Sequence, residues 1–126
     1  MSKKSGKIPK MGKIFRTPVY KSDLRSIYAY SLRHFGERVA DETMRQIQAV
    51  EKKAANDPSY GKLEAHYHSD FFRYRTIRNS QTVFFHHIGD DVVMITAGYC
   101  GRNWGAILKT LESEIKQHIQ AISDIS

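Results

Sequence analysis

The chain has 126 residues, of which 40% are hydrophobic and 26% charged, so it holds enough apolar material for one core and too little for two. Its single cysteine, Cys100, excludes an internal disulfide and a four-cysteine zinc site, and we expect a reducing cytoplasm as its location. No stretch approaches the roughly 18 apolar residues of a membrane span, and the lysine-rich start lacks the apolar segment of a signal peptide. A soluble and unexported protein is therefore predicted.

The positive charge is concentrated at the start of the chain. The formal net charge is +7, and residues 1–13 contribute five lysines and no acid. The remaining 15 basic and 13 acidic residues leave only +2, so any nucleic-acid site must rest on local clustering of basic groups. We expect residues 1–13 to form a basic, disordered arm and residues 14–126 to form the single folded domain, opening with a β-prone segment at 14–16.

Two consecutive helices are predicted in the first half of the domain. Thr17 followed by Pro18 is typical of a helix start, with a capping hydroxyl and a proline at the first helical position. Apolar residues then recur at helical spacing until Gly36, where a left-handed C-cap would end the helix. A second amphipathic stripe begins at about Glu37 and is broken at Pro58. This pattern predicts an αα-hairpin.

The second half of the domain changes to β-prone sequence. Residues 57–70 carry turn residues without a period and are expected to form a loop. Three segments rich in aromatic and β-branched residues then follow, which predicts an antiparallel meander of residues 71–77, 82–88 and 92–99. After Asn103 as a possible cap, an apolar stripe that starts at Trp104 predicts a long final helix with Trp104 in the core.

The expected fold class is therefore α+β. It consists of a short N-terminal strand, an αα-hairpin, a three-stranded antiparallel meander and a C-terminal helix. We expect the helices to cover one face of the sheet and to leave the other face open for binding.

Several short motifs in this order resemble the RelE/ParE toxin family, and the likeness spans residues 14–111. The motifs are Asp23-Leu24 with Ile27, Phe35-Gly36, Ala40 and Ile47, Pro58-Ser59-Tyr60-Gly61, Arg73, Thr82-Val83-Phe84-Phe85, Val92-Val93-Met94-Ile95, and Arg102. The resemblance implies the toxin of a bacterial type II toxin-antitoxin system, which inhibits growth, acts in stress responses and is neutralised by a cognate antitoxin.

The two branches of the family act differently. ParE-like members inhibit DNA gyrase by protein contacts without known catalytic residues, whereas RelE-like members cleave mRNA in the ribosomal A site with basic and tyrosine side chains. The DL-x-x-I helix and the P-x-x-G loop look more like the ParE branch, which we favour. A RelE-like endonuclease and a degenerate, non-catalytic member remain as alternatives.

Arginines are the main candidates for contacts with a target. Arg73 and Arg75 lie two apart in the first meander strand and so face the same side, Arg78 follows at the turn, and Arg102 lies past the last strand next to Tyr99. Guanidinium groups suit phosphate and developing negative charge. The alternative interpretation is the solvated face of a half-buried sheet.

A RelE-like mechanism would need further groups. Compared without gaps, Arg73, Arg75 and Arg102 match basic positions of that branch. Its remaining strand arginine falls on Thr82, and its tyrosine falls in a region that has only Ile107 and Leu108. His86, His87 or Tyr99 would then have to act as acid or base. His66 and His68 have the spacing of a metal pair but lack partners at a recognised spacing, so neither a metal nor another cofactor is expected. Catalysis is thus disfavoured.

The apolar stripe of the last helix continues beyond what one small domain needs. Its end, with Ile115, Ile119 and Ile122, is a candidate antitoxin surface or a contact with a second copy. The expected partners are a cognate antitoxin and DNA gyrase, or the ribosome and mRNA in the alternative, with a homodimer or a toxin-antitoxin hetero-oligomer as the assembly and no membrane.

Overall fold

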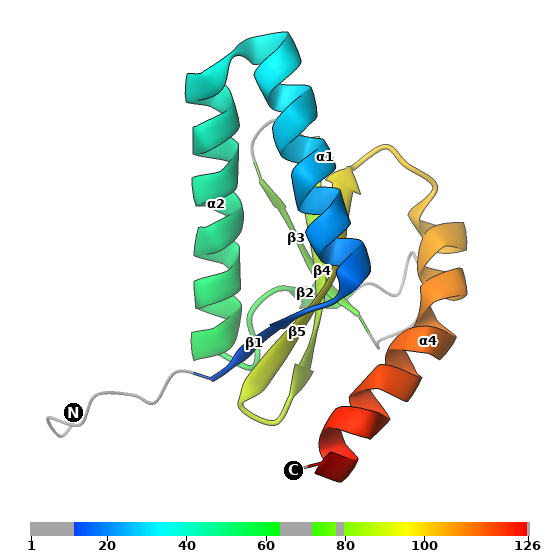
Figure 1. Cartoon of the computed structure of the whole chain (residues 1–126). Helices are drawn as coiled ribbons and strands as arrows, with labels where there is room; N and C mark the ends of the chain where they lie inside the picture. Colours follow the sequence, from blue (N-terminus) through cyan, green and yellow to red (C-terminus); the bar gives the residue numbers. More distant parts are fainter. Residues whose placement is uncertain (1–11, 64–71, 78–79, 126) are drawn as a thin grey trace, which may run out of the picture.

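The computed structural model describes residues 12–63, 72–77 and 80–125, and it describes their side chains except those of Leu63, Ile115 and residues 118–125. The elements are, in chain order, β1 (Ile14–Arg16), α1 (Pro18–Phe35), α2 (Glu37–Asn56), β2 (Lys62–Leu63), β3 (Arg73–Ile77), β4 (Gln81–Ile88), β5 (Asp91–Tyr99) and α4 (Trp104–Ile125) (Figure 1). The predicted α+β order of a strand, a helical hairpin, a meander and a final helix is confirmed.

Thr17 begins α1 and also fixes it to the sheet. Its hydroxyl oxygen accepts a hydrogen bond from the Tyr20 N–H at 3.0 Å and donates one to the Ile95 carbonyl at 2.8 Å. Its backbone N–H donates to the Met94 carbonyl at 3.1 Å. At the other end, Gly36 has φ +92° and joins α1 directly to α2, a conformation that glycine adopts without strain. The αα-hairpin therefore stands against β5.

The sheet has the strand order β1-β5-β4-β3-β2. The three central strands form the predicted antiparallel meander, and β1 lies parallel to β5 with Ile14 opposite Val92. β2 pairs with the start of β3, opposite Arg73 and Tyr74. β2 falls within residues 57–70, which the sequence predicted as loop. The strand was missed because two residues are too few to show a period.

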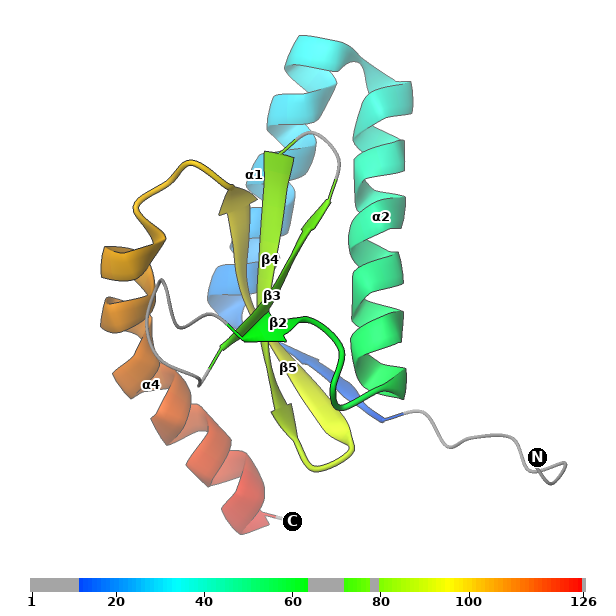
Figure 2. The same cartoon turned by 180° about the vertical axis from the view of Figure 1, so that it is seen from behind.

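Helices cover both faces of the sheet, which corrects the expectation that they cover one. Val83 and Phe85 pack with α1 and α2, whereas Phe84 between them packs with Trp104 and Leu108 of α4. The strands β4 and β5 are apolar on both sides, so each face needs a cover. Seen from the two sides, the sheet lies between the hairpin and α4 (Figures 1 and 2).

A buried carboxylate joins β1, α1 and α2. Glu51 is 3% exposed, accepts the Tyr20 hydroxyl at 2.7 Å, and forms a two-pronged ion pair with Arg16 at 3.2 and 2.7 Å. The hydrogen bond to Glu51 raises the pKa of Arg16, and burial, followed by the nearby Glu51 charge, raises the pKa of Tyr20. Arg16 is thus held in its charged form and Tyr20 in its neutral form.

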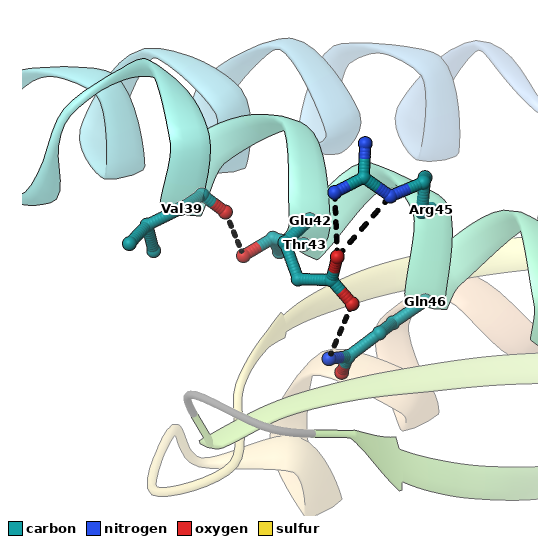
Figure 3. Close-up of polar contacts among 5 residues, drawn as sticks. All are labelled: Val39, Glu42, Thr43, Arg45 and Gln46. Atoms are coloured by element: carbon teal, nitrogen blue, oxygen red, sulfur yellow. Dashed lines mark hydrogen bonds and ion pairs between the residues drawn. The ribbon is translucent and has the colours of Figure 1, made fainter.

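The outer side of α2 carries a second carboxylate with very different surroundings (Figure 3). Glu42 accepts from the Arg45 guanidinium at 3.1 and 2.6 Å and from the Gln46 amide at 3.4 Å, and both partners lie within one helical turn. Nearby, the buried Thr43 hydroxyl donates to the Val39 carbonyl at 2.9 Å. Each of these hydrogen bonds joins two residues of α2.

Candidate functional site

A cavity of about 670 Å³ lies between α1 and the end of β5. Ile27 of α1 and Ala97 of β5 are buried and belong to its lining. Ser31, one turn further along α1, also lines the cavity and is only 4% exposed, yet none of the described residues hydrogen-bonds its hydroxyl. The Ser31 oxygen is not among the buried polar atoms that lack a partner, so it is accessible from the cavity. The cavity therefore presents a hydroxyl that can bind water or a ligand.

Exposed aromatic side chains surround this cavity. Tyr30, Phe35 and Tyr99 line it and are 53%, 57% and 58% exposed, and they are three of the five large hydrophobic side chains that are exposed in the described part of the chain. The ring of Tyr30 also lies 4.2 Å from that of His34, centroid to centroid. A gathering of exposed aromatic groups around one concavity is typical of an interaction site.

Arg102 forms the wall opposite α1. Its backbone N–H donates to the Tyr99 carbonyl at 3.1 Å, and its guanidinium carbon lies 5.1 Å from the centroid of the Trp104 ring. Gly98 leaves the room for this arrangement, because a Cβ there would lie 2.9 Å from the Arg102 Nη1 atom. Stacked on Trp104 and exposed, the guanidinium can direct its remaining N–H groups to an anion.

Asp23 explains why the first helix carries an acid at this position. Its carboxylate accepts hydrogen bonds from the Thr96 hydroxyl and from the Ala97 N–H at 3.1 Å. The same carboxylate lines the cavity. Asp23 therefore fixes α1 to β5 and helps to shape the site, with Leu24 and Ile27 packed below it on the apolar side.

The loop of residues 57–61 contains the P-x-x-G motif and has a structural explanation. The Asp57 carboxylate accepts from the Ser59 N–H at 2.9 Å and from the Ser59 hydroxyl at 2.7 Å, and these bonds, the hydroxyl first, lower the pKa of Asp57. Gly61 has φ +90°, and a Cβ there would lie 2.6 Å from the Phe85 ring. The glycine is thus required by both backbone and space.

Arg73 is committed to that loop. Its Nη1 atom donates to the Ser59 carbonyl at 3.1 Å and to the Gly61 carbonyl at 2.8 Å. Arg75 is exposed on the same side of β3, with its guanidinium carbon 5.7 Å from the centroid of the Tyr60 ring. Arg73 therefore ties the loop to the sheet, whereas Arg75 remains accessible beside it.

The paired histidines of β4 face opposite sides, as expected for neighbours in a strand. The His87 ring packs edge-on against Phe85 at 5.6 Å, and its Nε2 lies 3.5 Å from the Tyr60 carbonyl. Burial lowers the pKa of His87, against an opposing effect of that carbonyl. His86 lies opposite Val93 on the other face. Neither histidine is among the residues that line the cavity.

The candidate arginines do not form one patch. Arg73 and Arg75 lie opposite Phe85 and Val83, whose side chains pack on the hairpin side, while Arg102 stacks on Trp104, which packs on the α4 side. Of the proposed target contacts, the structure brings together Tyr99 and Arg102 at the cavity. Several other candidates lie outside the described residues or side chains, namely Arg78, His66, His68, Ile115, Ile119 and Ile122.

Two further positions noted in the sequence are buried. Thr82 is 2% exposed and its hydroxyl lies 3.1 Å from that of Thr76. Leu108 is fully buried beside Trp104, and the expectation that Trp104 belongs to the core is confirmed. Both departures from the RelE-like pattern therefore lie at positions that are closed to solvent.

The α1 side of the cavity was not foreseen from the sequence. Ser26, Tyr30 and Ser31 come from an amphipathic helix in which they look like ordinary surface or stripe residues. One signal was present, since Ser31 occupies a position of the apolar stripe and a hydroxyl there is unusual. Phe35, at the end of the same stripe, lies at the cavity and is largely exposed.

Two kinds of site are not seen within residues 12–63, 72–77 and 80–125. No three His, Cys, Asp or Glu side chains there gather in a way that would hold a metal ion. The helices of that part also lack the combination of length and apolar character that a bilayer crossing demands.

No family description matches the sequence, and neither does the sequence of any curated protein. Among solved structures, a similar chain comes from the chromosomal ParDE TA system of P. aeruginosa, with a TM-score of 0.55, 15% sequence identity, and coverage of 71% of this chain and 96% of that one. Another is the conserved hypothetical protein HP0894 from Helicobacter pylori, with a TM-score of 0.45, 18% identity, and coverage of 70% and 93%. The first likeness shows the fold, so this chain shares the fold of that chain of the ParDE TA system.

Proposed function

We propose that this chain is a ParE-like toxin of a type II toxin-antitoxin system. In this role it binds DNA gyrase, inhibits it by protein contacts and is neutralised by a cognate antitoxin. The observation that carries the proposal is the fold shared with a chain of the ParDE TA system, over almost the whole of that chain. The ordered motifs of the first helix and of the 57–61 loop add support from the sequence.

The arrangement of the basic groups favours binding over catalysis. A RelE-like nuclease would use several cationic side chains around one phosphate, but Arg73 is bonded to loop carbonyls and is not among the residues that line the cavity with Arg102. Thr82 and Leu108 are buried where that branch has reactive groups. Arg102 and Tyr99 remain together and accessible, as a binding surface needs.

We place the target contacts at the cavity, with Tyr99 and Arg102 as their centre. Exposed aromatic and arginine side chains are the groups that most often dominate protein interfaces. Arg75 lies away from the cavity, beside Tyr60, and would add a separate, weaker contact.

Induced expression in a bacterial host tests the proposal. We expect growth to stop, plasmid supercoiling to be lost and total mRNA to stay intact, and we expect Arg102→Gln to relieve the effect. Arg25→Gln, an exposed arginine of α1 outside the cavity lining, is the matched control and should remain toxic. Co-expression of a neighbouring small acidic gene product should restore growth.

Two results would contradict the proposal. Cleaved mRNA with normal plasmid topology would favour the RelE-like endonuclease. Normal growth with the folded protein accumulating would refute both toxic activities and leave a binding protein without toxicity.

A further inference from the structure

We propose that the cavity binds an extended, acidic peptide segment of a partner protein, which adds one residue in parallel orientation to the free edge of β5. The inference rests on the proposed function for the view that the cavity meets a protein. Its test does not depend on toxicity. Three features carry it: the hydrogen-bonding groups of the strand edge, the aromatic walls and the charge of the rim.

The far half of β5 has an edge without a neighbouring strand. β1 pairs only with Val92–Met94, and no other described strand lies on that side, although β5 continues to Tyr99. Cys100 donates its N–H to the Ser80 carbonyl at 2.8 Å. In an antiparallel ladder every second residue bonds the neighbouring strand, so residues 98 and 96 also bond β4. The backbone groups of Ala97 and Tyr99 therefore point away from β4.

Half of these outward groups already have partners. The Ala97 N–H donates to Asp23 at 3.1 Å, and the Tyr99 carbonyl accepts from the Trp104 indole N–H at 3.0 Å and from the Arg102 N–H at 3.1 Å. One step earlier, the Ile95 carbonyl accepts from the Thr17 hydroxyl at 2.8 Å. The Ala97 carbonyl and the Tyr99 N–H remain, and both residues line the cavity.

These two remaining groups select the orientation of a bound chain. In parallel pairing, one residue of the added strand donates to a carbonyl and accepts from the N–H two residues further on, which are here Ala97 and Tyr99. Antiparallel pairing would instead need both groups of one residue, and at Ala97 and at Tyr99 one of the two is occupied. The free edge therefore fits a single residue of a parallel strand, in the direction already set by β1.

The side chains around this edge define the rest of the segment. Tyr30, Phe35 and Tyr99 offer an aromatic recess for an apolar side chain. Arg102 on the rim suits a carboxylate, and the Ser31 hydroxyl deeper in the cavity lacks a partner among the described residues. Among the charged lining residues, the Asp23 carboxylate already accepts bonds from Thr96 and Ala97, which leaves Arg102 as the charged group available to a partner.

Two other occupants fit less well. The chain's own lysine-rich start enters the fold at Gly12, which is bonded to Ala55 and lies beside Asp90, before the beginning of β5 and so at the opposite end of that strand from the cavity. Its positive charge would also oppose that of Arg102. A second copy of the chain carries the same net positive charge, which disfavours this contact between copies.

The test uses the full chain and peptides selected on it from a displayed library of random nonapeptides. We expect the selected peptides to combine apolar residues with an acid. Methylation of the peptide nitrogens, one at a time, should weaken binding about tenfold or more at one interior position, where the donor to Ala97 is lost. In the complex, amide hydrogen exchange at Tyr99 should slow at least tenfold, an effect that side-chain insertion alone would not produce.

Variants locate the binding at the cavity. Arg102→Gln should weaken peptide binding about tenfold, a loss typical of one charge-assisted contact, whereas Arg25→Gln should leave it unchanged. The thermal unfolding of both variants serves as the check that they are folded.

The proposal is overturned if no peptide is enriched, if Tyr99 exchange is unaffected by a bound peptide, or if Arg102→Gln binds as well as the unaltered chain. It is also overturned if a mononucleotide displaces the peptide at micromolar concentration, or if sedimentation shows a dimer that the peptide dissociates. A protein that binds such a peptide but leaves gyrase and growth untouched would refute the proposed function alone.

Discussion

Arg73 begins β3 and Arg102 follows the end of β5, and the two arginines differ in their exposure and in their partners. Arg73 is half-buried and donates hydrogen bonds to two carbonyls of the 57–61 loop. Arg102 is exposed, stacks on Trp104 and borders a cavity that is also lined by the exposed rings of Tyr30 and Tyr99. Arg73 thus bonds backbone groups of its own chain, whereas Arg102 is accessible to a partner. We propose that the same residue type contributes to stability in one place and to binding in the other.

Removing the buried Glu51 carboxylate should give the largest loss of stability among the changes considered. We expect Glu51→Ala to lower the free energy of unfolding by about 3 kcal/mol, because Arg16 and the buried Tyr20 hydroxyl lose their shared partner. Urea unfolding measures the difference. Glu42→Ala removes the exposed pair with Arg45 and should cost less than about 1 kcal/mol. Equal losses for the two carboxylates would refute the comparison.

A glycine pair separates backbone strain from lack of space. Gly61→Ala should lower the free energy of unfolding by about 2 kcal/mol or more. The alanine would be strained in the left-handed backbone conformation, and its Cβ would also clash with the Phe85 ring. Gly36 has nearly the same φ with open space around it, so Gly36→Ala should cost only about 1 kcal/mol. Thermal and urea unfolding of both variants would show the difference, and an inverted order would mean that the 57–61 loop is not packed as described.

The two arginines themselves provide the next test. Arg73→Gln should lower the free energy of unfolding by about 1 kcal/mol, since two loop carbonyls lose their donor. Arg102→Gln should change it by no more than about 0.5 kcal/mol, because the side chain is exposed. Binding should show the reverse order. If Arg102→Gln proved the more destabilising change, its role as an available binding group would be untenable.

The smallest expected effect concerns His87 and pH. Burial lowers the pKa of His87 in the folded protein, so the unfolded chain takes up the proton first as the pH falls below about 6.5. The contribution of the neutral His87 ring to stability is complete above that pH. It is lost as the pH falls towards the lowered pKa of His87 in the folded protein. His87→Gln should therefore flatten the pH dependence of unfolding between pH 7.5 and 5. An unchanged slope would show that the ring is not desolvated.

Much of the fold could be predicted because its signals are local. The Thr17-Pro18 start, Gly36 and the apolar stripes set both hairpin helices, and all three meander strands appear where β-prone segments were expected. The two-sided cover of the sheet was missed, although consecutive apolar residues such as Val83-Phe84-Phe85 leave no face for solvent. Such runs predict burial on both faces, and that inference was not made.

The site was only half predictable for a different reason. Tyr99 ends β5 and Arg102 comes three residues later, so their closeness in space follows from their closeness in sequence. The opposite wall comes from α1, whose position against β5 depends on contacts between residues more than 70 apart, such as that of Asp23 with Thr96 and Ala97. That Arg73 bonds the 57–61 loop while Arg102 lines the cavity likewise depends on tertiary contacts, which a pattern of charges does not contain.

The measurement that tests the central claim most directly is gyrase supercoiling in vitro with the purified chain. The account predicts that the unaltered protein and Arg25→Gln inhibit supercoiling in proportion to their concentration, that Arg102→Gln inhibits at least tenfold more weakly, and that ribosome-bound mRNA stays intact under the same conditions. Uninhibited gyrase together with mRNA cleavage that depends on the ribosome would contradict it.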